Sequence, residues 1–199
     1  MFVTFEGLDG SGKTTQVELL AQLLRDEGRE VVTTREPGGT EVGERIRDVL
    51  LHESNDIVPW AEASLFAAAR AQLVDRVIAP ALERGADVLC DRYIDSSLAY
   101  QGVARGLGID PVLELNLHAT RGLLPDRTFL LTLDPEEARR RGGDDRDRIE
   151  REDDDFIARV DAAFRQLVDR FPQRILLVDG AQPPEQLAET IRGQLRDIS

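Results

Sequence analysis

A glycine-rich loop near the N-terminus carries the clearest chemical signal in the sequence. Residues 7–14 read GLDGSGKT and match the phosphate-binding pattern G-x-x-x-x-G-K-[ST] at every fixed position. In such a loop, backbone N–H groups and the N-terminus of the next helix surround nucleotide phosphates, and a hydroxyl such as that of Thr14 reaches Mg²⁺. Lys13 is the only lysine in the chain, and a compact ammonium suits the junction of β- and γ-phosphates better than a planar guanidinium. These residues predict a nucleoside triphosphate site.

Two later loops carry charged residues suited to phosphate and metal binding. Arg35 and Glu36 precede a turn forced by Pro37 and two glycines, and Asp91 and Arg92 follow a short apolar run. An aspartate in that position can hold Mg²⁺ through water, and an arginine can grip a phosphate with two hydrogen bonds. The residues alone leave ordinary roles open: a surface loop for the first pair, a helix cap and a surface ion pair for the second.

Phe66 and Arg70 stand four residues apart in an alanine-rich stretch, which places them on one face of a helix. A ring for stacking and a guanidinium for a carbonyl oxygen suit a pyrimidine base. Taken alone, an aromatic ring in a helix is more often part of the core. The pair is therefore a hypothesis that needs support from other motifs.

The elements that must position these residues alternate along the chain. Residues 14–25 have helical spacing, and short apolar runs predict strands at residues 1–5, 30–34, 87–90, 128–133 and 174–178. Helical stretches separate the strands, which predicts an α/β fold: a P-loop three-layer sandwich with helices on both faces of a five-stranded parallel sheet. Ligands of such sheets bind at the carboxyl ends of the strands, where these motifs begin. No composition break divides the chain, so residues 1–199 are predicted to form one domain.

Composition and charge narrow the class of protein. A net charge of -13 argues against a nucleic-acid surface, and we find no leader and no apolar run of about 18 residues for a membrane span. The expected location is the cytoplasm. Cys90 is the only cysteine and lies in an apolar run, so we expect a buried, inert thiol. Two distant histidines form no visible zinc-ligand set, which leaves Mg²⁺ with the nucleotide as the expected metal.

In this order, the motifs resemble those of bacterial-type thymidylate kinases, nucleoside-monophosphate kinases that phosphorylate dTMP with ATP. The matching segments span almost the full length: residues 5–15, 34–40, 66–70, 91–93, 96–97, 99–102, 125–126 and 147–150. The phosphate-binding loop occurs in many families, whereas the ordered set is specific. The resemblance implies ATP and dTMP as binding partners, Mg²⁺ as the cofactor and a homodimer as the assembly.

The resemblance also assigns residues to the ligands. The ATP set is Gly7, Leu8, Asp9, Gly10, Ser11, Gly12, Lys13, Thr14 and Thr15. The metal set is Thr14 and Asp91. The dTMP set is Asp9, Arg35, Glu36, Arg47, Phe66, Arg70, Arg92, Ser97, Tyr100 and Gln101. Asp9 would contact the 3′-hydroxyl, and Arg35 and Arg92 would hold the acceptor phosphate region.

The same resemblance describes the base pocket. Phe66 would stack on thymine, and Arg70 would hydrogen-bond to its O4. Ser97 and Gln101 would complete the pocket. Tyr100 would crowd the 2′ position and so exclude ribonucleotides.

Members of this family place a charge-stabilising arginine either in the phosphate loop or in the lid. The loop position here is Gly10, so the lid, expected at about residues 139–151, should supply it. The sequence does not choose among three candidates: Arg141, Arg146 and Arg148. The polar run 139–155 is expected to be a mobile excursion outside the core, and its stretch 142–145 departs from the more basic lids of similar proteins.

The expected chemistry is phosphoryl transfer from ATP to dTMP. The acceptor phosphate oxygen is already anionic, so in-line positioning and charge neutralisation suffice. Lys13, Mg²⁺ and lid arginines should supply that charge, and Arg92 is counted with the catalytic residues. A switch GTPase is disfavoured because its guanine-reading N-K-x-D segment needs a second lysine. A motor ATPase with 129–134 as its magnesium-binding strand would leave Phe66 and Arg70 unexplained. Another deoxynucleotide or nucleoside-monophosphate kinase is the nearer alternative.

Overall fold

One parallel sheet organises the structure, a computed structural model that describes residues 1–52, 56–142 and 147–195. Its strand order is β2-β3-β1-β4-β5, with parallel neighbours. The strands are β1 (Phe2–Glu6), β2 (Val31–Arg35), β3 (Asp87–Asp91), β4 (Arg127–Thr132) and β5 (Ile175–Asp179). Each lies within one residue of its predicted position. Asp91 is in register with both Phe5 and Arg35, so the loops after β1, β2 and β3 leave the sheet at one edge.

Strand β1 lies at the centre of the sheet and is buried along its whole length. Its side chains alternate between the faces. Val3 and Phe5 join the core formed with helices α1 (Lys13–Asp26) and α9 (Pro184–Gln194), whereas Phe2 packs against Tyr93 on the other face. Helices on both faces explain why the strand sequence is apolar without regular polar alternation.

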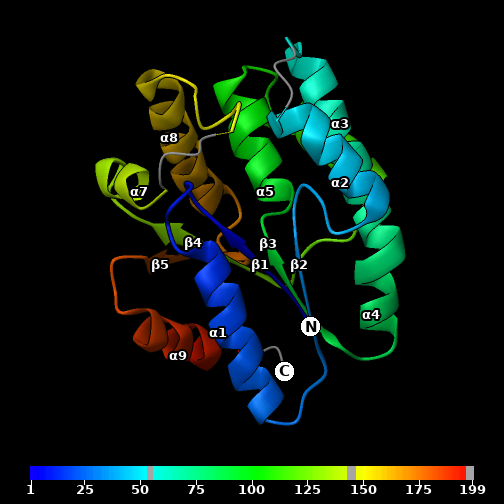
Figure 1. Cartoon of the computed structure of the whole chain (residues 1–199), viewed down its shortest axis with the longest axis vertical. Coiled ribbons are helices and arrows are strands. Elements are labelled where there is room, and N and C mark those ends of the chain that lie inside the picture. Colours follow the sequence, from blue (N-terminus) through cyan, green and yellow to red (C-terminus); the bar gives the residue numbers. More distant parts are fainter. Residues whose placement is uncertain (53–55, 143–146, 196–199) are drawn as a thin grey trace.

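Helices form the two outer layers (Figure 1). Helices α1 and α9 pack on one face. Helix α7 (Pro135–Gly142) follows β4 and lies beside α8, and its buried Ala138 belongs to the same core cluster as residues of α8 and η3. The opposite side is built from α2 (Glu41–Arg47), α3 (Pro59–Leu73), α4 (Ala79–Glu83), α5 (Ile94–Ser97), α6 (Ile109–Thr120) and α8 (Asp154–Arg170). Three π-helical segments extend helices of this side: η1 (Asp48–His52), η2 (Val74–Ile78) and η3 (Leu98–Ala104). Such segments often accompany functional sites.

Local sequence accounts for several helix starts. The side chain of Thr40 accepts a hydrogen bond from Gly43 N at 2.9 Å and begins α2. Asp153 accepts one from Phe156 N at 2.7 Å and begins α8. Gly12, with a φ of 95°, turns the chain from the phosphate loop into α1.

The polar run that was expected to lie outside the core divides into several parts. Residues 139–142 belong to α7, Ile149 is buried in the core, and α8 begins at Asp154. The expectation is therefore wrong for Ile149, whose buried apolar side chain belongs to the same core cluster as residues of η3 and α8. Residues 143–146, which include the candidate Arg146, lie outside the described residues, and the extent of the lid stays a prediction.

Two simpler expectations concern the cysteine and the membrane. Cys90 is fully buried in β3, and burial raises the pKa of its thiol well above the usual value, as expected for an inert thiol. Within the three described ranges, we find no helix both long and apolar enough to cross a bilayer.

Candidate active site

A cavity of about 780 Å³ opens at the carboxyl ends of the strands. Its size suits a small-molecule site, and its position is the one expected for a parallel α/β sheet. The predicted residues that line it are Asp9, Gly10, Ser11, Gly12, Lys13, Thr14, Thr15, Arg35, Glu36, Arg47, Phe66, Asp91, Arg92, Ser97, Tyr100, Gln101 and Arg141. Four further candidates are not part of the lining: Gly7, Leu8, Arg70 and Arg148.

The phosphate loop wraps around the side chain of Lys13. The Lys13 ammonium donates hydrogen bonds to the carbonyl oxygens of Gly7 at 3.1 Å and Leu8 at 2.8 Å, and it lies 3.7 Å from Asp9. Gly7 and Leu8 thus shape the loop through their backbone. Burial, followed by the nearby charge of Arg92, lowers the pKa of Lys13.

Two features of this loop suit the close approach of a phosphate. The hydroxyl of Ser11 is buried and has no hydrogen-bond partner among the described residues, so a phosphate oxygen could accept the hydrogen bond that this hydroxyl donates. Gly10 has a φ of +81°, and a Cβ there would lie 2.1 Å from the carbonyl oxygen of Ala138 in α7. Only glycine allows this contact, which holds α7 directly against the loop.

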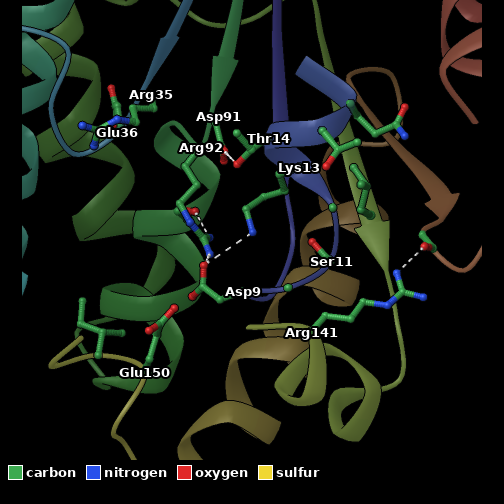
Figure 2. A pocket seen from close by; sticks show the side chains of 18 of the residues that line it. Asp9, Ser11, Lys13, Thr14, Arg35, Glu36, Asp91, Arg92, Arg141 and Glu150 are labelled. Carbon is green, nitrogen blue, oxygen red and sulfur yellow. Dashed lines mark hydrogen bonds and ion pairs between the residues drawn. The ribbon is translucent and has the colours of Figure 1, made fainter. Parts of the chain in front are cut away.

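Arg92 and Asp9 form an ion pair within the cavity (Figure 2). Arg92 Nη2 donates to Asp9 Oδ1 at 2.6 Å, and Nη1 donates to Ser96 Oγ at 2.9 Å. The guanidinium also lies 5.5 Å from the centre of the Tyr100 ring. Burial by itself would raise the pKa of Asp9, but the charges of Arg92 and Lys13 outweigh it and lower that pKa to about 2. Arg92 has a φ of 67°, a left-handed conformation that costs ~1–2 kcal/mol.

Glu6, which the sequence interpretation did not select, orients Arg92 through one hydroxyl. Its Oε1 accepts hydrogen bonds from the backbone N–H of Tyr93 at 2.8 Å and of Ser96 at 3.1 Å. Its Oε2 accepts the Ser96 hydroxyl at 2.5 Å, which in turn accepts from Arg92. Burial, followed by the charge of Asp95, raises the pKa of Glu6 to about 7. The one signal in the sequence was its place directly before the phosphate loop.

Thr14 and Asp91 meet at the cavity although 77 positions separate them. Thr14 Oγ1 donates to Asp91 Oδ2 at 2.6 Å (Figure 2). A hydroxyl and a carboxylate are oxygen ligands of the kind that Mg²⁺ takes beside nucleotide phosphates. The residues present therefore fit the expected metal.

An aromatic ring and an amide line another part of the cavity. Phe66 is partly buried on α3, Ser97 ends α5, and Tyr100 and Gln101 belong to η3. The Tyr100 ring packs 6.3 Å from that of Phe156 in α8, which fixes its orientation. A ring face together with polar side chains suits a flat heterocycle that carries hydrogen-bonding edges.

Arg70 contacts the lining residues and is itself 1% exposed. Its N–H groups are directed at Glu36, Ser97, Asn116 and the carbonyl oxygen of Tyr93. Burial raises the pKa of Glu36 against the opposing charge of Arg70, and Glu36 Oε1 has no partner within the described part of the chain. Arg70 therefore holds Glu36 and Ser97 in place, and its hydrogen bond to thymine O4 stays a prediction.

Two more arginines bring positive charge to the wall after β2. Arg35 is half-exposed and contacts Glu44 at 3.2 Å, and Arg47 donates to the carbonyl oxygen of Pro37 at 3.0 Å. Gly39, with a φ of +75°, lets this loop turn, and Arg35 and Arg47 both line the cavity. An anionic ligand would find them opposite the phosphate loop.

Arg141 is the described lid arginine that lines the cavity. It approaches from the other side of the phosphate loop than Asp9 does (Figure 2). Its Nε lies 2.8 Å from Glu137 Oε1, and its Nη1 lies 3.3 Å from the carbonyl oxygen of Gly180. These contacts involve exposed or backbone partners, so the guanidinium can exchange them for a phosphate at small cost.

Arg148 is placed differently. Its Nη2 donates to the buried Glu62 at 2.6 Å and its Nε to the carbonyl oxygen of Leu50 at 2.7 Å. Arg148 is not part of the cavity lining, so its assignment as the arginine of the transferred phosphoryl has no support from this geometry. The third candidate, Arg146, lies outside the described residues.

Two groups of residues that line the cavity were not predicted as site residues from the sequence. The loop 180–184 after β5, continued by Leu187, lines one part, and Asp147, Ile149 and Glu150 line another. The first has a signal in the sequence, because the turn GAQPP directly follows the last strand at the same sheet edge. The second lies within a motif already matched to the family, but no role was assigned to its members.

Comparisons with known proteins agree with this geometry. A family model described as thymidylate kinase matches residues 5–191. The chain belongs to the thymidylate kinase family. The thymidylate kinase of Leifsonia xyli subsp. xyli is 53% identical over 198 residues, 98% of this chain and 94% of the relative. That of Thermoanaerobacter sp. (strain X514) is 50% identical over 182 residues, 91% of this chain and 90% of the relative.

A solved structure supports the fold of this thymidylate kinase family member. The crystal structure of thymidylate kinase from Ehrlichia chaffeensis matches with a TM-score of 0.81 and 32% identity, covering 98% of each chain. The predicted α/β P-loop fold is therefore confirmed, as is the predicted family.

Proposed function

We propose that the cavity binds ATP and dTMP together and transfers the terminal phosphoryl group of ATP to dTMP, giving dTDP and ADP. One observation carries this proposal: a single cavity joins the phosphate loop, the ion pair of Asp9 with Arg92, and the wall that contains Phe66 and Gln101. Membership of the thymidylate kinase family supports the same reaction and the same two substrates.

The donor side of the proposed site is the phosphate loop. Its backbone N–H groups, the Ser11 hydroxyl and the Lys13 ammonium would surround the phosphates of ATP. The adenine would lie toward the loop 180–184, because that part of the lining adjoins Arg141 on the side away from Asp9.

The acceptor side is the wall opposite. Phe66 would stack on thymine, and Tyr100 would leave no room for a 2′-hydroxyl. Asp9 would accept a hydrogen bond from the 3′-hydroxyl, and Arg92, already turned into the cavity by its contact with Ser96, would hold the dTMP phosphate.

Transfer then depends on positioning and charge. The attacking phosphate oxygen is already anionic and needs no strong general base. Lys13 and Arg92 both contact Asp9, and Arg141 would leave Glu137 and Gly180 to reach the transferred group. Together the three cations would neutralise the charge that develops on that group. Thr14 would hold Mg²⁺ directly and Asp91 would hold it through water, and the ion would add positive charge at the β- and γ-phosphates.

We also propose that the enzyme is a cytoplasmic homodimer that does not bind nucleic acid. The net charge of -13 supports the last point. Val58 and Trp60, 63% and 49% exposed at the start of α3, offer apolar surface to a second copy. Sedimentation velocity on the purified chain would test the dimer.

A coupled assay for ADP tests the reaction. Purified enzyme with magnesium-ATP should phosphorylate dTMP, use dUMP and dCMP less well, and leave thymidine unreacted because thymidine has no acceptor phosphate. Lys13→Ala should reduce turnover at least about 10³-fold with the circular dichroism spectrum unchanged. Equal rates with all monophosphates would overturn the choice of dTMP, and a variant that keeps more than about a tenth of the activity would overturn the phosphate-loop assignment.

A further inference from the structure

A buried carboxylate lies next to the base wall of the cavity. Glu62 on α3 is 1% exposed and is not part of the lining. Gln101 Nε2 donates to Glu62 Oε1 at 2.9 Å, Arg105 donates to both oxygens at 3.2 Å, and Arg148 Nη2 donates to Oε2 at 2.6 Å. Glu62 thus connects α3 with η3, with Arg105 directly after η3, and with Arg148 of the predicted lid.

The two arginines keep Glu62 ionised. Burial by itself would raise the pKa of Glu62, but the hydrogen bonds from Gln101, Arg105 and Arg148 outweigh it and lower that pKa. An ionised carboxylate only accepts hydrogen bonds. Any neutral partner of Glu62 must therefore turn a donor toward it.

This restriction decides how the amide of Gln101 is oriented. Gln101 is 1% exposed and lines the cavity, and its NH₂ group must face Glu62. No donor from the described part of the chain contacts the amide oxygen, Oε1. That oxygen is consequently the acceptor that Gln101 offers to a ligand, beside the second N–H of its amide.

Helix α3 places Glu62 in line with the rest of the base wall. Glu62, Phe66 and Arg70 recur every four residues and so share one face of the helix. Phe66 lines the cavity and Arg70 holds Ser97, which lines it too. The residue that orients Gln101 and the ring proposed to stack on the base thus belong to the same rigid element.

We propose that Glu62 is a positioning residue for base specificity: it fixes Gln101 with its amide oxygen toward the base, so that the site selects a pyrimidine whose N3 carries a hydrogen. Thymine carries that hydrogen, whereas N3 of cytosine is an acceptor and would face the oxygen unpaired. This inference rests on the proposed function, in which the base lies between Phe66 and Gln101. Arg148 serves this arrangement by holding Glu62.

The test compares two acceptors that share the 5-methyl group. dTMP and 5-methyl-dCMP differ at N3 and C4 only, and the measured quantity is the ratio of their kcat/KM values. In Glu62→Gln, an amide replaces the carboxylate and can turn its own donor toward Gln101, which allows the Gln101 amide to reverse. The ratio should fall at least about tenfold, mainly through a higher KM for dTMP, because an unpaired polar group is what rejects the wrong base. The KM for ATP should not move.

Glu152→Gln is the matched control. Glu152 also accepts from Arg105, at 2.6 Å, but it does not contact Gln101. Its substitution should leave the ratio as in wild type. Gln101→Met keeps the size of the side chain without its amide, and it should reproduce the loss of selectivity while Glu62 retains both arginines.

A measurement on the unaltered enzyme covers the case in which Glu62→Gln fails to fold. The side-chain amide protons of Gln101, assigned by their loss in Gln101→Met, should be protected from solvent exchange before dTMP is added. Free exchange, or an equal loss of activity with both acceptors in Glu62→Gln, would overturn the proposal. Failure of wild type to phosphorylate dTMP would instead overturn the proposed function.

Discussion

The buried ion pair of Arg70 with Glu36 leads to a stability prediction whose size follows from the structure. The side chains are 1% and 3% exposed, and two guanidinium nitrogens contact Glu36 Oε2 at 2.7 and 2.5 Å. Arg70→Met keeps an unbranched apolar side chain but leaves the carboxylate buried without its cation. Breaking a buried pair in this way costs about 3–5 kcal/mol. In a chain of this length, about 2–4 °C of Tm is lost for each kcal/mol, so Tm should fall by roughly 6–20 °C.

Equilibrium unfolding in urea, followed by circular dichroism, measures this loss. Arg76→Met is the control, because Arg76 is 70% exposed and its contact to Asp75 is 3.8 Å long, so the free energy of unfolding should change by less than about 0.5 kcal/mol. The double variant Arg70→Met with Glu36→Leu should recover most of the loss, since no buried charge remains. If Arg70→Met unfolds at the wild-type urea concentration, or if the double variant is no more stable than the single one, the reasoning is refuted.

Three further predictions concern binding, catalysis and pH. Phe66→Ala should raise the KM for dTMP roughly 5- to 150-fold, because stacking is worth about 1–3 kcal/mol, and should leave the KM for ATP unchanged; equal rises would place Phe66 in the core. Arg141→Ala should lower kcat at least about 10²-fold, with little change in the KM for dTMP. Arg148→Ala should instead mainly raise the KM for dTMP, because Arg148 holds Glu62. Steady-state kinetics that show the reverse pattern would contradict both assignments. Glu6→Gln should flatten the pH dependence of stability. The pKa of Glu6 is about 7 in the folded protein against a usual 4.5, so the folded wild type binds this proton more tightly than the unfolded chain does. As pH rises from 4.5 to 7, the free energy of unfolding of wild type should therefore fall, relative to that of the variant, by up to about 1.4 kcal/mol per pH unit. Urea midpoints of the two proteins that stay parallel across this range would contradict the prediction.

Much of the fold could be predicted because its signals are local. Strand positions came within one residue, since short apolar runs between turn residues can only be strands covered on both faces when helical stretches separate them. The phosphate loop could be predicted for the same reason, because its backbone conformation depends on glycines a few positions apart. Ile149 was the exception, since a single apolar residue in a charged run gives no local sign that it packs in the core.

The site was predicted less completely. Phe66, Arg92 and Gln101 line one cavity, and their contacts with dTMP stay predictions. Arg70 and Arg148 bind protein carboxylates beside that cavity. An arginine in a motif can contact a ligand or hold the residues that do, and its type and spacing are the same in both cases. Only the direction of its N–H groups in the folded protein shows which of these two roles an arginine has.

By itself, the amino-acid sequence determined the class of fold, the phosphate loop and the family, because each depends on residue types at short and fixed spacing. Tertiary structure alone decided which polar side chains meet. Gln101 is hydrogen-bonded to Glu62, which lies 39 positions away in the sequence. The corresponding separations are 90 positions for Glu6 with Ser96 and 98 positions for Arg148 with Leu50. A buried carboxylate must take whichever donors the packed helices bring within about 3 Å, so the orientation of Gln101 and Arg92 is a property of the assembled core.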